Sequence, residues 1–244
     1  MSEMKPENYV VIDLEMTGLS PKTHRIIEIG AVKVKDSAIV QTFGTLVDPR
    51  RPIPERVQEL TGITDDMVRG QKEQDEAIEE LLSFLGDDLI VGQNVTFDYS
   101  FLKQWAVNKK IPLEKRACDT LKIARSLLPP EQPKNLKALC EYFGISREQG
   151  HRALDDAIQT AELFERLKLL AAEKYQKQED YDKFLKPREL IYKAKRQTPA
   201  TAHQLQRLKE YRRNHNLTDD ICYESLSRNE VSRLMDHYYG TYGR

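Results

Sequence analysis

The chain has 244 residues, and its 38 Lys and Arg nearly balance its 39 Asp and Glu. This length suits one large domain, or one medium domain with an appendage. No apolar run is long enough to span a membrane, and residues 1–8 lack the apolar core of a signal peptide, so we expect no membrane partner. Three widely spaced cysteines, Cys118, Cys140 and Cys222, match neither a zinc site nor a disulfide framework and favour a reducing cytoplasm.

The main part of the chain has the pattern of an α/β domain. β-Branched runs predict strands, and apolar side chains spaced as one helical face predict helices. The expected strands span residues 9–14, 26–34, 39–47 and 89–91, and the expected helices span 55–60, 73–85, 97–107, 119–127, 135–143 and 153–175. Three strands followed by helices that alternate with short strands indicate a mixed sheet flanked by helices, over residues 1–172.

The composition changes after this domain. Residues 173–197, rich in Lys, Gln, Asp and Tyr, predict a linker with some helical character. Residues 198–244 predict a small helical module, in which Ser227 and Glu230 have the spacing of a capping box. Two short helices bury little surface, so we expect the module to dock on the main domain or on a partner.

The charge is unevenly distributed. Residues 1–170 carry a balance of −5, whereas residues 171–244 carry +4. An acidic body with a basic tail fits a metal-binding enzyme whose appendage contacts nucleic acid, and it fits ordinary solvated helix surface equally well.

Two acids interrupt the first predicted strand. Asp13 and Glu15 are two residues apart, so both project from one face of the strand. Acids are poor strand formers, and the apolar residues around this pair argue against a simply exposed strand end. Carboxylates gathered in a partly buried place need compensation, usually from a divalent metal. The pair could therefore grip one ion, or two ions that share Asp13.

A third acid, Asp98, heads a predicted helix. Phe101, Leu102 and Trp105 follow it at the spacing of one helical face, so Asp98 continues a buried stripe. The alternative is an ordinary acid of the first helical turn, stabilised by the helix dipole. This segment alone does not decide between the two.

The last candidates lie at the start of the helix predicted over residues 153–175. Asp155 shares a polar face with Gln159, whereas Asp156 lies on a face of small and apolar residues, so we expect Asp156 to point inward and Asp155 to be solvated. His151 precedes the helix and should lie on a mobile loop at the mouth of the site, as a base that titrates near neutral pH. Four inward acids with one histidine suggest metal-dependent phosphodiester hydrolysis.

Three ordered motifs carry a family resemblance. Asp13-x-Glu15, Asn94-x-x-Phe97-Asp98 and His151-x-x-x-x-Asp156 resemble those of the DEDDh (DnaQ-like) 3′–5′ exonucleases, over roughly residues 9–170. That family has a ribonuclease H-like fold and includes the proofreading epsilon subunit of bacterial DNA polymerase III.

The resemblance implies roles for the site residues. Asp13, Glu15, Asp98 and Asp156 would hold two Mg²⁺ or Mn²⁺ ions, and His151 would deprotonate the attacking water. The product would be a nucleoside 5′-monophosphate. The implied substrate-binding residues are Met16, Thr17, Gly18, Leu19, Gln93 and Asn94.

Two departures from the family pattern leave the substrate open. Met16 stands where Thr is frequent and Gln93 where His is frequent, so the reading of the 2′-hydroxyl that separates RNA from DNA is not fixed. We favour the 3′ end of DNA, in proofreading or repair, over RNA trimming. The C-terminal module is a candidate for docking on a polymerase or repair complex. A catalytically silent binding module is disfavoured because all five site residues are present.

Overall fold

The computed structural model describes residues 7–146, 151–218 and 221–243 of the chain. Residues 1–6, most of the segment judged above to lack a signal-peptide core, lie outside these ranges. No helix within the described ranges has both the length and the apolar character needed to cross a membrane.

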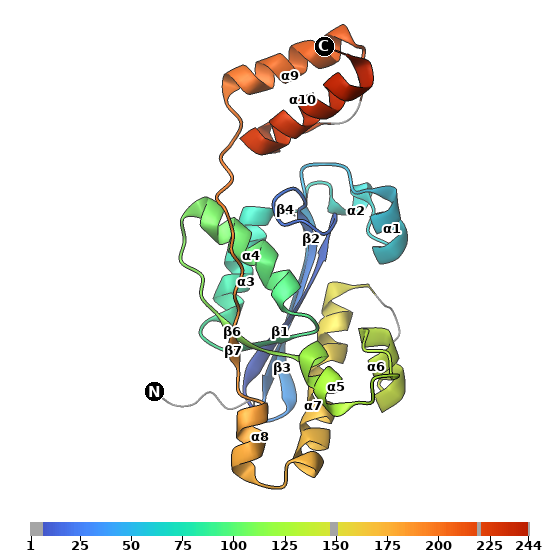
Figure 1. Ribbon diagram of the computed structural model, residues 1–244, viewed down its shortest axis with the longest axis vertical. Coiled ribbons are helices and arrows are strands. Elements are labelled where there is room, and N and C mark those ends of the chain that lie inside the picture. The colour runs from blue at the N-terminus through green and yellow to red at the C-terminus, as the bar shows by residue number, and fades with distance from the viewer. Residues whose placement is uncertain (1–6, 147–150, 219–220, 244) are drawn as a thin grey trace.

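A mixed sheet forms the centre of the body (Figure 1). Its strands are β1 (Tyr9–Met16), β2 (Ile26–Lys35), β3 (Ala38–Asp48), β4 (Lys72–Glu73), β5 (Leu89–Gly92), β6 (Arg116–Asp119) and β7 (Arg188–Glu189). The spatial order is β4-β3-β2-β1-β5-β6-β7. β1, β2 and β3 are antiparallel neighbours, whereas β5 and β6 continue the sheet parallel to β1. The expected α/β fold with a mixed sheet is confirmed.

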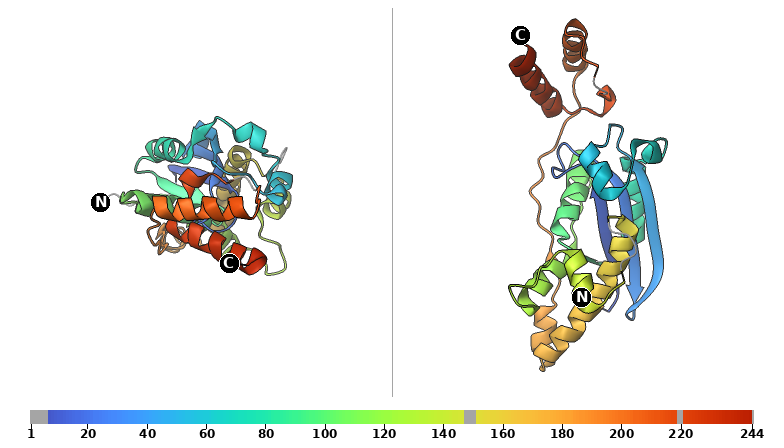
Figure 2. Two further views of the ribbon diagram at one scale, coloured as in Figure 1. Left: turned by 90° about the horizontal axis from the view of Figure 1, so that it is seen from above. Right: turned by 90° about the vertical axis from the view of Figure 1, so that its right-hand side faces the viewer.

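Helices cover both faces of this sheet (Figures 1 and 2). The body contains α1 (Glu55–Thr61), α2 (Asp65–Val68), α3 (Gln74–Leu85), α4 (Thr96–Lys109), α5 (Thr120–Leu127), α6 (Leu136–Phe143), α7 (Ala153–Lys174) and α8 (Gln178–Phe184). α3 and α4 pack on one face, and α5, α6 and α7 pack on the other.

The alternation of side chains along β1 explains both cores. Val10, Ile12 and Leu14 belong to the core under α3 and α4, while Tyr9 and Val11 belong to the core under α7. β-Branched and aromatic residues suit a strand that is covered on both faces. The odd-numbered residues therefore point toward α7, and the two acids of this strand continue that series.

Strand β6 is an element that the sequence pattern did not reveal. Residues Arg116–Asp119 pair in parallel with β5 immediately before α5. Four residues are too few to show a period, and the strand contains an arginine and an aspartate. Its identity comes from pairing with a neighbour, which is a long-range property.

The segment expected as a linker, residues 173–197, differs from that expectation. Its first part folds onto the body as α8 and β7, and β7 pairs antiparallel with β6. Leu185 and Leu190 are buried in the two cores of the body. The connector proper is therefore short, and Gln197 still donates its backbone N–H to Asn108 of α4, at 2.8 Å.

The C-terminal module consists of α9 (Ala202–Asn214) and α10 (Arg228–Tyr242), which lie beyond one end of the sheet (Figure 1). Leu208, Val231 and Met235 form its small core. The capping box of Ser227 and Glu230 is confirmed, and α9 has a second one at Thr201.

The module docks on the body through a cluster of charged groups. Arg51 donates to Oε1 of Glu230 at 3.2 Å and to the hydroxyl of Ser225 at 3.3 Å. Arg25 lies 3.7 Å from the same carboxylate. Glu230 is 6% exposed, so two arginines of the body share one buried carboxylate of the module.

Candidate active site

The two acids of β1 lie near the end of the strand that meets the start of α7. Asp13 is paired with Gly30 and Glu15 with Glu28 of the neighbouring strand β2. Both acids are half-buried, and both lie on the face of β1 that α7 covers. The expectation that they share one face follows from this register.

Asp98 reaches the same place from the opposite face of the sheet. It lies in the first turn of α4, is 5% exposed, and accepts a hydrogen bond from the backbone N–H of Leu14 at 3.0 Å. Phe101, Leu102 and Trp105 are also buried. The inward stripe predicted from the helical spacing is confirmed, and it places the Asp98 carboxylate against the backbone of β1 at Leu14.

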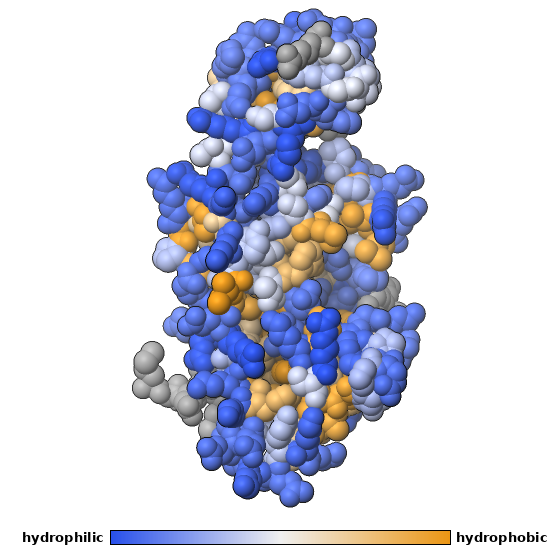
Figure 3. All heavy atoms as spheres, in the orientation of Figure 1, coloured by the Kyte–Doolittle hydropathy of each residue, from blue (hydrophilic) through white to orange (hydrophobic). Residues whose placement is uncertain are grey.

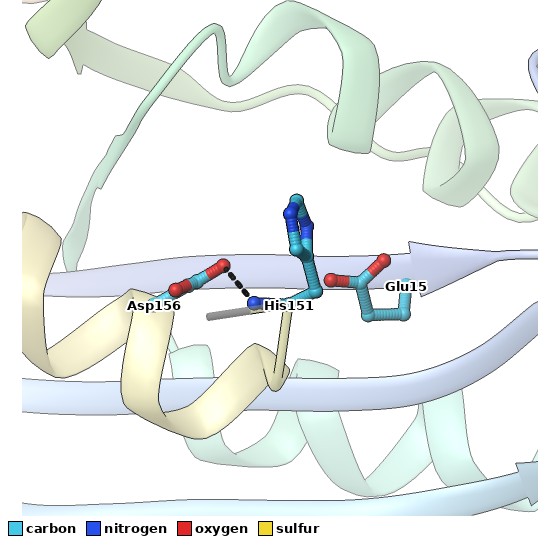
Figure 4. A group of neighbouring side chains, drawn as sticks. All are labelled: Glu15, His151 and Asp156. Carbon is cyan, nitrogen blue, oxygen red and sulfur yellow. Dashed lines mark hydrogen bonds between the residues drawn. The ribbon is translucent and has the colours of Figure 1, made fainter. Parts of the chain in front are cut away.

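The start of α7 contributes the remaining two groups (Figure 4). Asp156 is 6% exposed, and its Oδ2 accepts a hydrogen bond from the backbone N–H of His151 at 3.2 Å. The ligand atoms of Glu15, His151 and Asp156 all lie within 4.8 Å of one another. The His151 side chain is exposed, as expected for a residue at the mouth of a site.

The predicted difference between the two neighbouring aspartates holds in part. Asp156 is buried and Asp155 is half-buried, in the predicted order. The polar face assigned to Asp155 is not fully solvated, however, because Gln159 is only 5% exposed. A long helix that lies across a sheet buries more than one narrow stripe, which periodicity alone underestimates.

An ion pair between buried Glu28 and half-buried Arg152 fixes the start of α7, and the sequence motifs do not include Glu28. Glu28 accepts hydrogen bonds from Nη2 of Arg152 and from the backbone N–H of Ala153, both at 2.8 Å. These two residues directly follow His151. The available signal was an acid in the middle of an apolar strand, where only a partnered charge is tolerated.

A second missed residue supports the other side of the site. Oδ1 of Asp119 caps α5 by accepting from Leu121 N–H, and it also accepts from the backbone N–H of Asn94, each at 3.1 Å. Asn94 has a left-handed backbone, with φ at 61°. Asp119 therefore holds the turn that leads into α4 and Asp98.

Burial, together with the neighbouring carboxylates, raises the pKa of two acids of the site, Asp13 and Asp98. Burial is the main cause of the raised pKa of Asp13, and the negative charge of Asp98 adds to it. Burial likewise raises the pKa of Asp98 to about 8, although the hydrogen bond from Leu14 opposes that shift. So much buried negative charge is costly without a cation.

The donor set fits divalent cations of the hard class. Carboxylate oxygens are the ligands that Mg²⁺ and Mn²⁺ prefer. Four carboxylates converge here, and their mutual charges are unfavourable unless they are neutralised. The expected metal ligands, Asp13, Glu15, Asp98 and Asp156, are therefore able to hold such ions together.

The segment after β1 forms a closed turn beside these acids. Thr17 and Arg25 exchange two hydrogen bonds, of 2.8 and 3.0 Å, at its base. Gly18 is required because a Cβ there would lie 2.4 Å from Cδ2 of His24. Leu19 stands at the tip with 81% of its surface exposed. An exposed leucine beside a polar site is available for packing against a bound group.

A cavity of about 530 Å³ lies beside Leu19. Its lining also includes Asn94, Thr96 and Phe97, from the turn before α4 and from its first residues. Two of the six expected substrate-binding residues, Leu19 and Asn94, thus line one cavity near the carboxylates.

The side chains of two other residues expected to bind substrate, Met16 and Gln93, contact other parts of the protein. The Met16 side chain is 8% exposed and belongs to the core, and its assignment to substrate binding stays a prediction. The Gln93 amide donates to the carbonyl of Lys134 at 2.7 Å and accepts from Thr120 at 2.5 Å. The departures of Met16 and Gln93 from the family pattern do not remove any of the four carboxylates.

Comparisons with known proteins agree with this geometry. Residues 10–164 match the family model RNase_T, described as exonuclease. The DNA polymerase III subunit epsilon of Aquifex aeolicus is 40% identical over 160 residues, which cover 64% of this chain and 78% of that protein. A DNA polymerase III PolC-type from Clostridium perfringens is 43% identical over 157 residues, 64% of this chain but only 11% of the relative.

A solved structure shares the fold. Exonuclease X in complex with 5′ overhanging duplex DNA superposes with a TM-score of 0.54 and 26% sequence identity, covering 72% of this chain and 99% of that one. The likeness supports the ribonuclease H-like arrangement expected from the three motifs. The C-terminal module lies outside the residues that the family model matches.

Proposed function

Since the chain belongs to the exonuclease family that residues 10–164 match, we propose that it is a metal-dependent 3′–5′ exonuclease releasing nucleoside 5′-monophosphates. The observation that carries this proposal is the convergence of acids from β1, α4 and α7 with a histidine beside them. A silent binding module has no need for so unfavourable a gathering of charge.

The roles follow from where each group lies. Asp13, Glu15, Asp98 and Asp156 would hold two divalent cations, which stabilise charge on the reacting phosphate when bound. His151 accepts the proton of the attacking water, since its ring is exposed yet close to two of the carboxylates.

The chain's other groups orient the reactants. Leu19 packs against the terminal base, and Asn94 lies near its sugar and phosphate. Thr17 and Gly18 shape the turn that presents Leu19. Glu28 is a positioning residue, because it holds the backbone that follows His151.

We favour DNA as the substrate because the relatives described above are named as DNA polymerase III proteins. Since the chain spans only 11% of the PolC-type relative, action within a polymerase or repair complex is also a proposal. RNA trimming is the alternative outcome of the test below.

The test is a degradation assay with end-labelled DNA and RNA strands in Mg²⁺ or Mn²⁺, with EDTA as the control. A 3′ label should appear at once in a mononucleotide, and a 5′ label should appear in a ladder of shortening strands. Release from the 5′ end, or equal activity in EDTA, would contradict the proposal. Faster degradation of RNA than of DNA would identify RNA as the preferred substrate.

A further inference from the structure

A second cleft adjoins the candidate site. It has a volume of about 390 Å³ and lies between the start of α4, helix α5 and residues 184–190. Thr96 lines both this cleft and the cavity beside Leu19, so the two adjoin at this residue. Residues 184–190, which form one wall, lie beyond the residues that the family model matches.

The cleft carries an excess of positive charge. Lys122, Arg125, Lys186 and Arg188 all line it with exposed side chains. Arg125, Lys186 and Arg188 form no ion pair with any residue that the structure describes, whereas Lys122 lies 3.5 Å from Asp119. Asp119 and Glu189 also line the cleft, so its four cations outnumber its two acids.

An aromatic side chain accompanies the cations. Phe184, at the end of α8, is half-buried and lines the cleft. Figure 3 shows hydrophilic side chains around small apolar patches on the lower half of this face, where α5 and α8 lie. A basic groove with an aromatic platform is the usual arrangement for binding a single nucleic acid strand.

We propose that this cleft binds the sugar-phosphate backbone of a single strand upstream of its 3′-terminal nucleotide. The inference rests on the proposed function, since the strand's end would occupy the cavity beside Leu19. The position of the cleft next to that cavity, together with Phe184, favours nucleic acid over an acidic peptide. The three unpaired cations would each neutralise a phosphate.

The experiment measures binding of 5′-fluorescent oligothymidylates of 12 and 3 nucleotides to the full chain in EDTA, across a series of salt concentrations. The cleft variant combines Arg125→Gln, Lys186→Gln and Arg188→Gln. The matched control combines Lys35→Gln, Lys110→Gln and Lys177→Gln, which remove three exposed charges away from both clefts.

Each phosphate contact to a single strand contributes about 0.7 to the slope of log affinity against log salt. The cleft variant should therefore lower that slope by about 2 and weaken 12-nucleotide binding about 100-fold at 0.1 M salt. The control and the 3-nucleotide strand should change far less. Equal losses in the two variants, or for the two strand lengths, would overturn the inference.

Degradation of the 12-nucleotide strand by the unaltered chain in Mg²⁺ tests the proposed function separately. A cleft effect on binding without any degradation would reject the exonuclease proposal and keep the cleft. Degradation by the unaltered chain, with no effect of the cleft variant on binding, would keep the exonuclease proposal and reject the cleft.

Discussion

Gly30 is the position at which one methyl group should disturb the site most. The backbone of Ala153, at the start of α7, lies directly over it, and a Cβ at Gly30 would be 2.1 Å from the carbonyl carbon of Ala153. Neither partner is a flexible side chain, so Gly30→Ala must push the first turn of α7 away from the sheet. That turn carries Asp156, and His151 directly precedes it.

The size of the displacement follows from the geometry. Ordinary contact begins at 3.4 Å, so the backbone must move by about 1.3 Å. Misplacing catalytic groups by about 1 Å can cost about 100-fold in rate, and we expect a loss of that order in kcat/KM. Overpacking should also lower the free energy of unfolding by about 1–3 kcal/mol.

The matched control is Gly44→Ala, on the neighbouring strand. Gly44 pairs with Gly30, but its nearest neighbour would be the end of the Leu154 side chain at 3.2 Å, which can move. The assays are exonuclease kinetics and urea unfolding of both variants. If Gly30→Ala matched Gly44→Ala in both measurements, the argument that α7 is seated on Gly30 would be wrong.

Four further predictions follow from other parts of the structure. Asp156→Ala should abolish cleavage, whereas Asp155→Ala should keep most of it; comparable losses in kinetic assays would reject the inward assignment of Asp156. Burial raises the pKa of Cys118 to about 12, so at pH 8 its thiol stays protonated, and a thiol reagent should label Cys222 first and Cys118 only after unfolding; mass spectrometry of early labelled peptides decides this. Glu230→Gln keeps a residue suited to the capping box but leaves Arg25 and Arg51 without their carboxylate. It should weaken docking of the module by about 3 kcal/mol, which hydrogen exchange would detect as faster exchange in α10. Arg51→Met should show the same change, and protection equal to that of the unaltered chain would contradict the contact. A chain ending at residue 197 should unfold cooperatively in urea. A chain ending at residue 172 should have a lower free energy of unfolding, because it loses the buried Leu185 and Leu190, worth about 1.5–3 kcal/mol each. Equal free energies of unfolding for the two shortened chains would refute the role of these leucines in the core.

The carboxylates could be predicted because local patterns determine where they point. Asp13 and Glu15 needed only the two-residue period of a strand, and Asp98 and Asp156 needed only helical phase. Each of these inferences concerns one element, and the structure keeps those elements. The family motifs then supplied what periodicity cannot, namely that the separate elements meet.

The supporting groups could not be predicted in the same way. Glu28 matters because Arg152 and Ala153 reach it from more than 120 residues away, and β6 exists because β5 lies beside it. The burial of Met16 is a similar case, because its place in the motif is adjacent to the substrate turn, yet its position in β1 directs the side chain to the core. Such features depend on tertiary pairing rather than on local sequence.

The short strand β7 has a consequence for how copies of this protein behave in solution. By pairing with Ala117 and Arg116 it covers the outer edge of β6, whose backbone N–H and C=O groups would otherwise face solvent. An uncovered edge is a template on which another chain can add a strand. By covering this edge, β7 limits self-association through the sheet. Shortened chains that lack β7 should form aggregates.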